Sequence, residues 1–393
     1  MTTYEYLARV IRDSYLVIRF CPIHSRESPC TINPMKKVVI LSAFLSPFRS
    51  GAEAMVEEVS KQLGGQYDIT IVTGLYNHSL PRETELDGSG VRVIRVGIGR
   101  KIDKFLFPFL AIGVIRQRKP MIVHAVLESY AGFGLVLCRW FFPRAKRILT
   151  LQSTNTSFLL GPIHRSAQQL TAISSVLRER AKKFGNQKVH VIPNGVSLTA
   201  VQDALTFHER VVGRVLFVGR LEAMKGVDTL LCAFHDLVYS KSPKPFHRDV
   251  LHLRIVGDGS KRPELERMAK ELHIADRVTF VGMLPPTAVY DEYAMAQVFC
   301  GLSRSEALGN VFIEAQAAGC AVVATHVGGI PDIVQNGQTG FLVEPDHEQS
   351  AAHAMLKLLS DDELRAKVTA AAQVHAKAFD WSHIAQLYAH LYG

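Results

Sequence analysis

Two glutamates, Glu306 and Glu314, stand eight positions apart on either side of a glycine turn. Gly309 between them permits backbone conformations that other residues rarely adopt, so a ligand can approach the chain closely. The amides of Asn310 and Val311, at the start of the helix that follows, can donate to phosphate or sugar oxygens. Glu314, about one turn into that helix, can accept hydrogen bonds from ribose hydroxyls. Taken singly, either glutamate would also suit the start of a surface helix, where the helix dipole favours acidic residues.

A second group of polar residues supplies positive charge. Arg220 and Lys225 follow the apolar run Arg214–Gly219 and precede another helical segment. A guanidinium and an ammonium at a helix start can bind a diphosphate and neutralise it as a leaving group. The alternative is two exposed basic side chains without a ligand. The presence of both groups in one chain favours a binding site over two unrelated surface features.

Short apolar runs separated by helical segments must position these residues. In the first half such runs are Val38–Leu41, Tyr67–Thr73, Val91–Val96, Met121–His124 and Arg147–Leu151. In the second half they are Arg214–Gly219, Leu251–Val256, Val278–Val281, Val298–Gly301 and Ala321–Ala324. Runs of this length between helices are typical of parallel sheets covered on both faces. We expect an α/β chain of two doubly wound, Rossmann-like domains facing across a cleft, with ligands at the carboxyl ends of the strands.

The chain divides into four segments. Residues 1–34 contain three prolines and no regular apolar pattern, so they are expected to form an extension of doubtful order. Met35 would also suit an initiator, which makes the leader itself doubtful. The turn Pro193-Asn194-Gly195 ends the first domain, which spans 35–195. A second domain covers 196–376. The last segment, 377–393, is predicted to contain a helix that crosses back to the first domain.

Composition limits the possible compartments and partners. The chain has 393 residues, 48% of them hydrophobic, and six cysteines without a Cys-x-x-Cys pair, which argues against a zinc site or a disulfide framework. No run of 18 apolar residues and no signal peptide is evident, and we expect a cytoplasmic protein. No nucleic-acid-binding motif or aromatic platform is present either.

Positive charge is concentrated in the first half of the chain. Residues 1–200 hold 27 Lys and Arg against 13 Asp and Glu, an excess of 14, whereas the remainder holds 18 against 23. The apolar run 105–115 lies between Lys101 and Lys104 on one side and Arg116, Arg118 and Lys119 on the other. This pattern suits peripheral contact with an anionic membrane surface. A helix that covers the sheet and carries a basic tail is the alternative.

Several segments of the second half closely resemble glycosyltransferase family 4, whose members are retaining enzymes of the GT-B fold. In family order over roughly 130 residues, the matches are Val218–Arg220 with Lys225-Gly226, Ile255–Gly259, Val278–Gly282, Glu306–Glu314, Gly319–Thr325, Gly328–Asp332 and Gly337–Val343. In the first domain, Ser50-Gly51-Ala52-Glu53 resembles the family's glycine loop, with Ser50 in place of one of its two glycines.

The resemblance implies a site for a nucleotide-sugar donor. Arg220 and Lys225 would bind the diphosphate and, with Glu306 at the donor sugar, form the catalytic set. Glu314 would bind the ribose. The remaining donor-binding residues would be Gly51, Gly219, Gly282, Met283, Leu284, Gly309, Asn310 and Val311. Members of the family need no metal, and the chain has no Asp-x-Asp motif, so no metal or other cofactor is expected.

The acceptor side departs from the family pattern. Many members place a histidine where this chain has Gln152, and glutamine cannot act as a general base. Gln152 would then position a substrate while the leaving phosphate takes the acceptor proton. His124 is the other candidate for acceptor contact, although a histidine at a strand end is often only structural. Ala307 and Leu308 also replace the common Gly-Phe pair.

These observations together predict a retaining hexosyltransferase that acts on a hydroxyl of a glycan or a lipid-linked glycan. Two alternatives remain. Other GT-B proteins epimerise nucleotide sugars, and a homologue could bind the donor without turnover. The donor base, the donor sugar and the linkage are not specified by the sequence.

Overall fold

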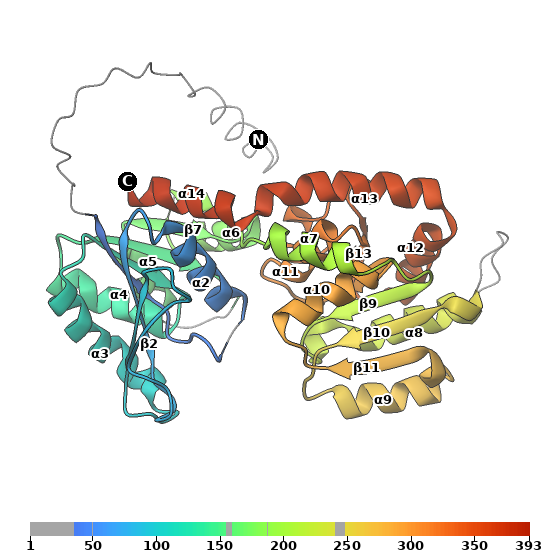
Figure 1. The fold of residues 1–393 in the computed structure, drawn as a ribbon, viewed down its shortest axis with the longest axis horizontal. Coiled ribbons are helices and arrows are strands. Elements are labelled where there is room, and N and C mark those ends of the chain that lie inside the picture. Colours follow the sequence, from blue (N-terminus) through green and yellow to red (C-terminus); the bar gives the residue numbers. More distant parts are fainter. Residues whose placement is uncertain (1–34, 49, 155–158, 187, 240–247) are drawn as a thin grey trace, which may run out of the picture.

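The computed structural model describes residues 35–48, 50–154, 159–186, 188–239 and 248–393, arranged as two α/β domains (Figure 1). The expected N-terminal extension, 1–34, lies outside the described residues. Both domains are built on parallel sheets, in agreement with the predicted fold class.

The first domain contains an eight-stranded sheet in the order β3-β4-β2-β1-β5-β6-β7-β8. Its strands are β1 (Lys37–Leu41), β2 (Asp68–Gly74), β3 (Glu83–Glu85), β4 (Arg92–Val96), β5 (Ile122–Val126), β6 (Lys146–Leu151), β7 (Gln169–Ala172) and β8 (Val189–Val191). Among the strand pairs of this domain that the structure describes, β3 with β4 is antiparallel and the others are parallel. Val38 and Ile40 belong to one core and Val39 and Leu41 to the opposite one, because successive side chains of β1 point to opposite faces.

The second domain contains a six-stranded sheet in the order β11-β10-β9-β12-β13-β14, and all of its pairings are parallel. Its strands are β9 (Arg214–Val218), β10 (His252–Val256), β11 (Val278–Gly282), β12 (Val298–Gly301), β13 (Ala321–Thr325) and β14 (Phe341–Val343). All five runs predicted here end within one residue of these strands. The β9 run extends past its strand into Gly219, which begins the connecting loop.

Helices cover both faces of both sheets. They are α2 (Gly51–Leu63), α3 (Asp103–Arg118), α4 (Tyr130–Phe141), α5 (Leu160–Ser166), α6 (Ser175–Lys183), α7 (Leu198–Phe207), α8 (Val227–Tyr239), α9 (Arg262–Glu271), α10 (Pro286–Met295), α11 (Asn310–Ala317), α12 (Glu348–Ser360), α13 (Asp362–Ala376) and α14 (Trp381–Tyr392). Helices α3 and α4 pack on one face of the first sheet, and α2 and α14 lie over the other. In the second sheet, α8 and α12 cover one face and α10 and α11 the other.

Each sheet has one point at which its strand order reverses. In the first sheet it lies between β1 and β5, and in the second between β9 and β12. The loops that follow such a pair of strands turn to opposite faces of the sheet and leave a crevice between them. The loops after β9 and β12 carry Lys225 and Glu306, so the topology brings the two predicted clusters together.

The chain passes between the domains twice, and the two crossings touch. Val196 donates its backbone N–H to Phe379 at 2.8 Å, and Trp381 donates to Val196 at 3.3 Å. The indole of Trp381 covers Gly195, where a Cβ would come within 2.7 Å of the ring. Helix α14 then packs along α2 of the first domain, and the two helices lie side by side in Figure 1.

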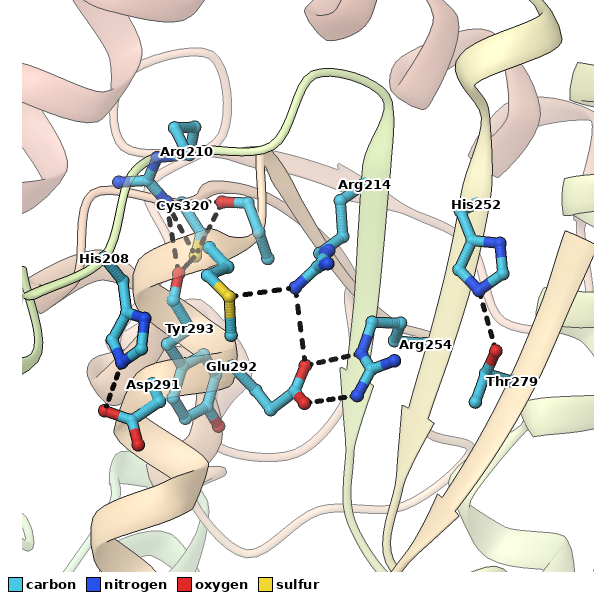
Figure 2. Close-up of polar contacts among 12 residues, drawn as sticks. His208, Arg210, Arg214, His252, Arg254, Thr279, Asp291, Glu292, Tyr293 and Cys320 are labelled. Atoms are coloured by element: carbon cyan, nitrogen blue, oxygen red, sulfur yellow. Dashed lines mark hydrogen bonds and ion pairs between the residues drawn. The ribbon is translucent and has the colours of Figure 1, made fainter.

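A buried ion pair holds α10 on the second sheet. Figure 2 shows the carboxylate of Glu292 between two guanidinium groups. Arg254 of β10 donates its Nε–H to the Glu292 carboxylate at 2.7 Å and a second hydrogen bond through Nη2. Nη1 of Arg214, on β9, lies 3.9 Å from the same carboxylate. The bonds from Glu292 raise the pKa of Arg254. Arg214 also donates to the sulfur of Met295, one turn further along α10.

Removing the carboxylate should destabilise this packing. In Glu292→Ala, two partly buried guanidinium groups lose their counter-ion, and we expect the free energy of unfolding to fall by about 2–3 kcal/mol. Glu271→Ala is the control, since this exposed glutamate pairs with the exposed Arg267 at 3.5 Å, and its loss should change stability by less than about 0.5 kcal/mol. Urea unfolding followed by circular dichroism measures both. Equal stability of the two variants would contradict the structural role of Glu292.

Candidate active site

A cleft of about 560 Å³ lies between the carboxyl edges of the two sheets. The first domain contributes residues that follow five of its strands: Ser50, Gly51, Ala52, Leu127, Gln152, Ser153, Thr154, Ile173 and Asn194. The second domain contributes residues that follow β9 and β12: Arg220, Met224, Lys225, Ser305, Glu306, Ala307, Leu308, Gly309, Asn310 and Val311. The cleft therefore opens at the reversal points of both sheets.

An ion pair between Lys225 and Glu306 lies within this cleft. The Lys225 ammonium donates to one carboxylate oxygen of Glu306, and the hydroxyl of Ser303 lies 3.4 Å from the same oxygen. The two side chains are 17% and 15% exposed, so most of their surface is shielded from solvent. Arg220 lines the same cleft and is exposed. One carboxylate and two cations thus face one space, a charge pattern suited to a diphosphate and a hydroxyl-bearing group.

Glycines shape the loop that carries Glu306. Gly309 has a φ of 92°, in the left-handed region that favours glycine, and it lies immediately before α11. Gly328 has a φ of 56°, and a Cβ there would come within 1.8 Å of the Glu306 carbonyl oxygen. The segment that carries Gly328 thus packs directly against the backbone of Glu306. Any side chain at Gly328 would displace it.

The first domain meets the start of α11 through Gly51. A Cβ at Gly51 would lie 2.7 Å from the Asn310 side-chain nitrogen, so a larger residue here would displace the Asn310 amide. Ser50, which stands where the family usually has another glycine, serves α2 instead. The Glu53 carboxylate accepts the Ser50 backbone N–H at 2.8 Å and also its hydroxyl, a capping arrangement at the start of that helix.

Gln152 is paired with Asn194. Its amide donates to Asn194 at 2.9 Å and accepts from it at 3.0 Å. Asn194 also donates to the side chain of Asn310 in the other domain, at 3.3 Å. The sequence pattern predicts Asn194 only as part of a turn, and its place in the cleft was not predicted. Its position after β8, at the carboxyl edge of the sheet, was the available signal.

Some predicted donor residues lie outside the cleft lining. Glu314 accepts a hydrogen bond of 2.9 Å from the Tyr293 hydroxyl, and burial together with the nearby carboxylate raises the pKa of that tyrosine. Gly219, Gly282, Met283 and Leu284 do not line the cleft, and the Met283 side chain is 74% exposed. Their contacts with ribose and base stay predictions.

His124 does not reach the cleft, which removes the geometric basis for its predicted contact with the acceptor. Its ring nitrogens lie 2.7 Å from the Tyr392 hydroxyl and 2.7 Å from the Thr150 hydroxyl. Tyr388 packs beside the ring at a centroid distance of 5.4 Å. The strand was expected to end at residue 124 but continues to Val126, so His124 lies inside the sheet beneath α14.

Among the described residues, no group of three or more His, Cys, Asp or Glu side chains is arranged to hold a metal ion. Within the same part of the chain, none of the helices is long and apolar enough to cross a membrane.

Comparison with known proteins establishes the family. The model for glycosyl transferases group 1 matches residues 212–375, and the model for glycosyltransferase family 4 matches residues 49–200. A D-inositol 3-phosphate glycosyltransferase from Rhodococcus jostii (strain RHA1) is 38% identical over 92% of this chain and 90% of its own length. The chain belongs to glycosyltransferase family 4. A relative with the same description from Acidothermus cellulolyticus is 38% identical over 88% of each chain.

Solved structures support the architecture. Sucrose-phosphate synthase from Thermosynechococcus elongatus matches with a TM-score of 0.78 at 22% identity, over 91% of this chain and 98% of that one. HepE from Anabaena, solved with UDP and glucose, matches with a TM-score of 0.72 at 20% identity, over 91% and 99%. This family 4 glycosyltransferase accordingly has the GT-B fold.

The environment of His124 predicts how stability depends on pH. Burial lowers its pKa to about 3, whereas the unfolded chain binds a proton near pH 6.5. The stability that His124 contributes is therefore present above pH 6.5 and is lost as the pH falls toward 3. Between pH 7.5 and pH 5.0, we expect the free energy of unfolding of the wild-type chain to fall by roughly 2 kcal/mol more than that of His124→Gln.

Urea midpoints at the two pH values measure this difference. His326→Gln, which changes a histidine with a 58% exposed side chain, should retain the wild-type pH dependence. If the His124→Gln variant showed the same acid sensitivity as wild type, a neutral buried His124 would be contradicted.

Proposed function

We propose that this family 4 glycosyltransferase moves a hexose from a nucleoside diphosphate sugar to a hydroxyl group, with retention of the anomeric configuration. The observation that carries the proposal is the Lys225–Glu306 pair, which joins the loops before α8 and α11 and shares the cleft with Gly51 at the start of α2. One side of this arrangement suits a diphosphate, and the other suits a sugar ring.

The donor would lie along the second domain. Arg220, Lys225 and the first amides of α11 would offset the charge of the diphosphate and stabilise it as it leaves. Glu306 would accept hydrogen bonds from the sugar, and Glu314 from the ribose. Gly219 and the residues Gly282–Leu284 would complete the nucleotide pocket. The structurally similar HepE was solved with UDP and glucose, which makes a UDP-sugar the first donor to test.

The reaction would need no metal ion. Two side-chain cations and a helix N-terminus can take the place of a divalent cation at the diphosphate. In this proposal the activity is the same in EDTA as in buffer with magnesium.

The acceptor would enter from the first domain. Described residues on that wall of the cleft are hydroxyl, amide, apolar or glycine residues, among them Ser153, Thr154 and Gln152. Because Gln152 cannot take a proton, the departing phosphate would accept the proton of the acceptor hydroxyl. The acceptor would be a glycan, a lipid-linked glycan or a cyclic polyol. Several relatives are named for D-inositol 3-phosphate, so this compound belongs in the first acceptor panel.

A donor screen followed by product analysis tests the proposal. UDP-, GDP- and ADP-sugars are each tested for a shift in unfolding temperature, since a ligand that binds only the folded chain raises it. The donor that binds is then supplied with the acceptor panel. NMR of the product gives the anomeric configuration, and an inverted product would reject retention. Conversion of the donor to its epimer without an acceptor would instead favour an epimerase.

Glu306→Gln separates catalysis from binding. The variant keeps the size of the side chain but loses the charge that faces the sugar and Lys225. We expect kcat to fall about 100-fold or more, while nucleotide affinity stays within about threefold of wild type. Glu344→Gln is the control, because its side chain is 76% exposed and does not line the cleft. Equal turnover by both variants would contradict a role for Glu306, and no turnover by wild type with any donor would favour a non-catalytic homologue.

Peripheral membrane contact is a second part of the proposal. Helix α3 buries Phe107, Ala111 and Ile115 against the sheet, as the covering-helix alternative predicted, but leaves Phe105 and Phe109 more than half exposed. Trp140, at the end of α4, is 78% exposed. Lys104 lies over the ring of Phe105 at 5.0 Å. Exposed aromatic rings beside cations suit the interface of an anionic bilayer.

Vesicle binding tests this surface. Phe105→Ser/Phe109→Ser should weaken binding to phosphatidylglycerol-containing vesicles by about tenfold or more, because two apolar rings no longer enter the interface. Phe207→Ser is the control, since Phe207 is 80% exposed but lies on α7. Sedimentation with vesicles gives the bound fraction. Absence of wild-type binding, or equal binding by the double variant, would reject the surface.

A further inference from the structure

A carboxylate of the second domain caps a helix of the first. Asp332 accepts the backbone N–H of Ser175 at 2.6 Å and the Ser175 hydroxyl at 2.7 Å. Ser175 is the first residue of α6, and the preceding Ser174 makes no side-chain cap bond. A negative charge at a helix N-terminus that also accepts two hydrogen bonds is a favourable arrangement. It forms only when the two domains lie as they do here.

The turn that carries Asp332 also contacts the backbone of Glu306. Gly329 donates its N–H to the Glu306 carbonyl at 3.2 Å, and Gly328 lies against the same oxygen. A Cβ at Gly329 would meet Ala307 at 2.3 Å and the side chain of Ser174 at 2.8 Å. The turn 328–332 is therefore enclosed between the Glu306 loop on one side and the start of α6 on the other.

We propose that Asp332 is a positioning residue for Glu306. When Asp332 caps α6, the turn 328–332 is held against the Glu306 backbone, and the carboxylate of Glu306 is fixed in the cleft. When the domains separate, water replaces Asp332 at α6, and the turn loses one of its two supports. Approach of the domains is thus linked to the geometry of the sugar-contacting carboxylate. This inference rests on the proposed contact between Glu306 and the donor sugar.

The contacts of Asp332 also separate a role in positioning Glu306 from a role in folding alone. The Asp332 bonds join two separate domains, and neither partner group belongs to the hydrophobic core of its own domain. Loss of the cap should therefore alter the approach of the domains and turnover more than stability. Arg220, Lys225 and α11 belong to the second domain alone, so nucleotide binding should be nearly unaffected.

Asp332→Asn and Ser175→Ala test the proposal in the full chain. For Asp332→Asn we expect kcat to fall about 10- to 100-fold, with the Kd of the matching nucleoside diphosphate within about threefold of wild type. Ser175→Ala, which keeps the backbone donor, should have a smaller effect in the same direction. Asp361→Asn is the matched control, because Asp361 caps α13 within the second domain through Leu364 at 3.0 Å.

Small-angle X-ray scattering gives a readout that a purely structural role would not change. Adding the nucleoside diphosphate should leave Asp332→Asn with a larger radius of gyration than wild type and Asp361→Asn. An unchanged kcat in Asp332→Asn, or a loss of kcat no greater than that in Asp361→Asn, would overturn the role of Asp332. The proposed function would still stand, because the wild-type chain would be active. A wild-type chain without turnover would reject the proposed function itself.

Discussion

The reversal of strand order in each sheet is the constraint on which the site depends. Loops after β9 and β12 must diverge because their helices cover opposite faces, and the same holds for β1 and β5. The two crevices face each other, so Lys225, Glu306 and Gly51 at the start of α2 line one cleft. Glycines permit the close approaches: Gly328 leaves no room for a Cβ against the Glu306 backbone, and Gly51 lies against the Asn310 amide.

Polar contacts across the cleft connect the two domains. Asn194 joins Gln152 to Asn310, and Asp332 joins the Glu306 loop to α6. The chain crosses between the domains near Val196 and Asp380, with Trp381 covering Gly195. Domain approach is thus limited by two covalent crossings and by a small set of charge-assisted or amide bonds. The position of the Glu306 carboxylate therefore depends on both domains, although its hydrogen-bond partners Lys225 and Ser303 lie in the second.

The sequence was sufficient to predict what depends on local pattern. Apolar runs located strands such as Val298–Gly301, and the glycine before Asn310 located the start of α11. Short edge strands such as β3 and β14 carry only three residues and have weak patterns, and they were missed. The roles of Asn194 and Asp332 depend on the approach of segments more than 100 residues apart, which no local pattern encodes. His124 lies inside β5 because that strand continues to Val126, two residues past its predicted end.

Hydrogen exchange with bound donor tests the central claim most directly, namely that the cleft between the two reversal points is the donor site. Mass spectrometry of the chain with and without its nucleotide sugar reports backbone protection along the sequence. The account predicts protection in peptides that cover 219–226 and 303–311, with additional protection at 50–52 from the facing domain. Protection confined to other segments, such as Asp362–Gln373 beside a separate cavity of about 270 Å³, would contradict it.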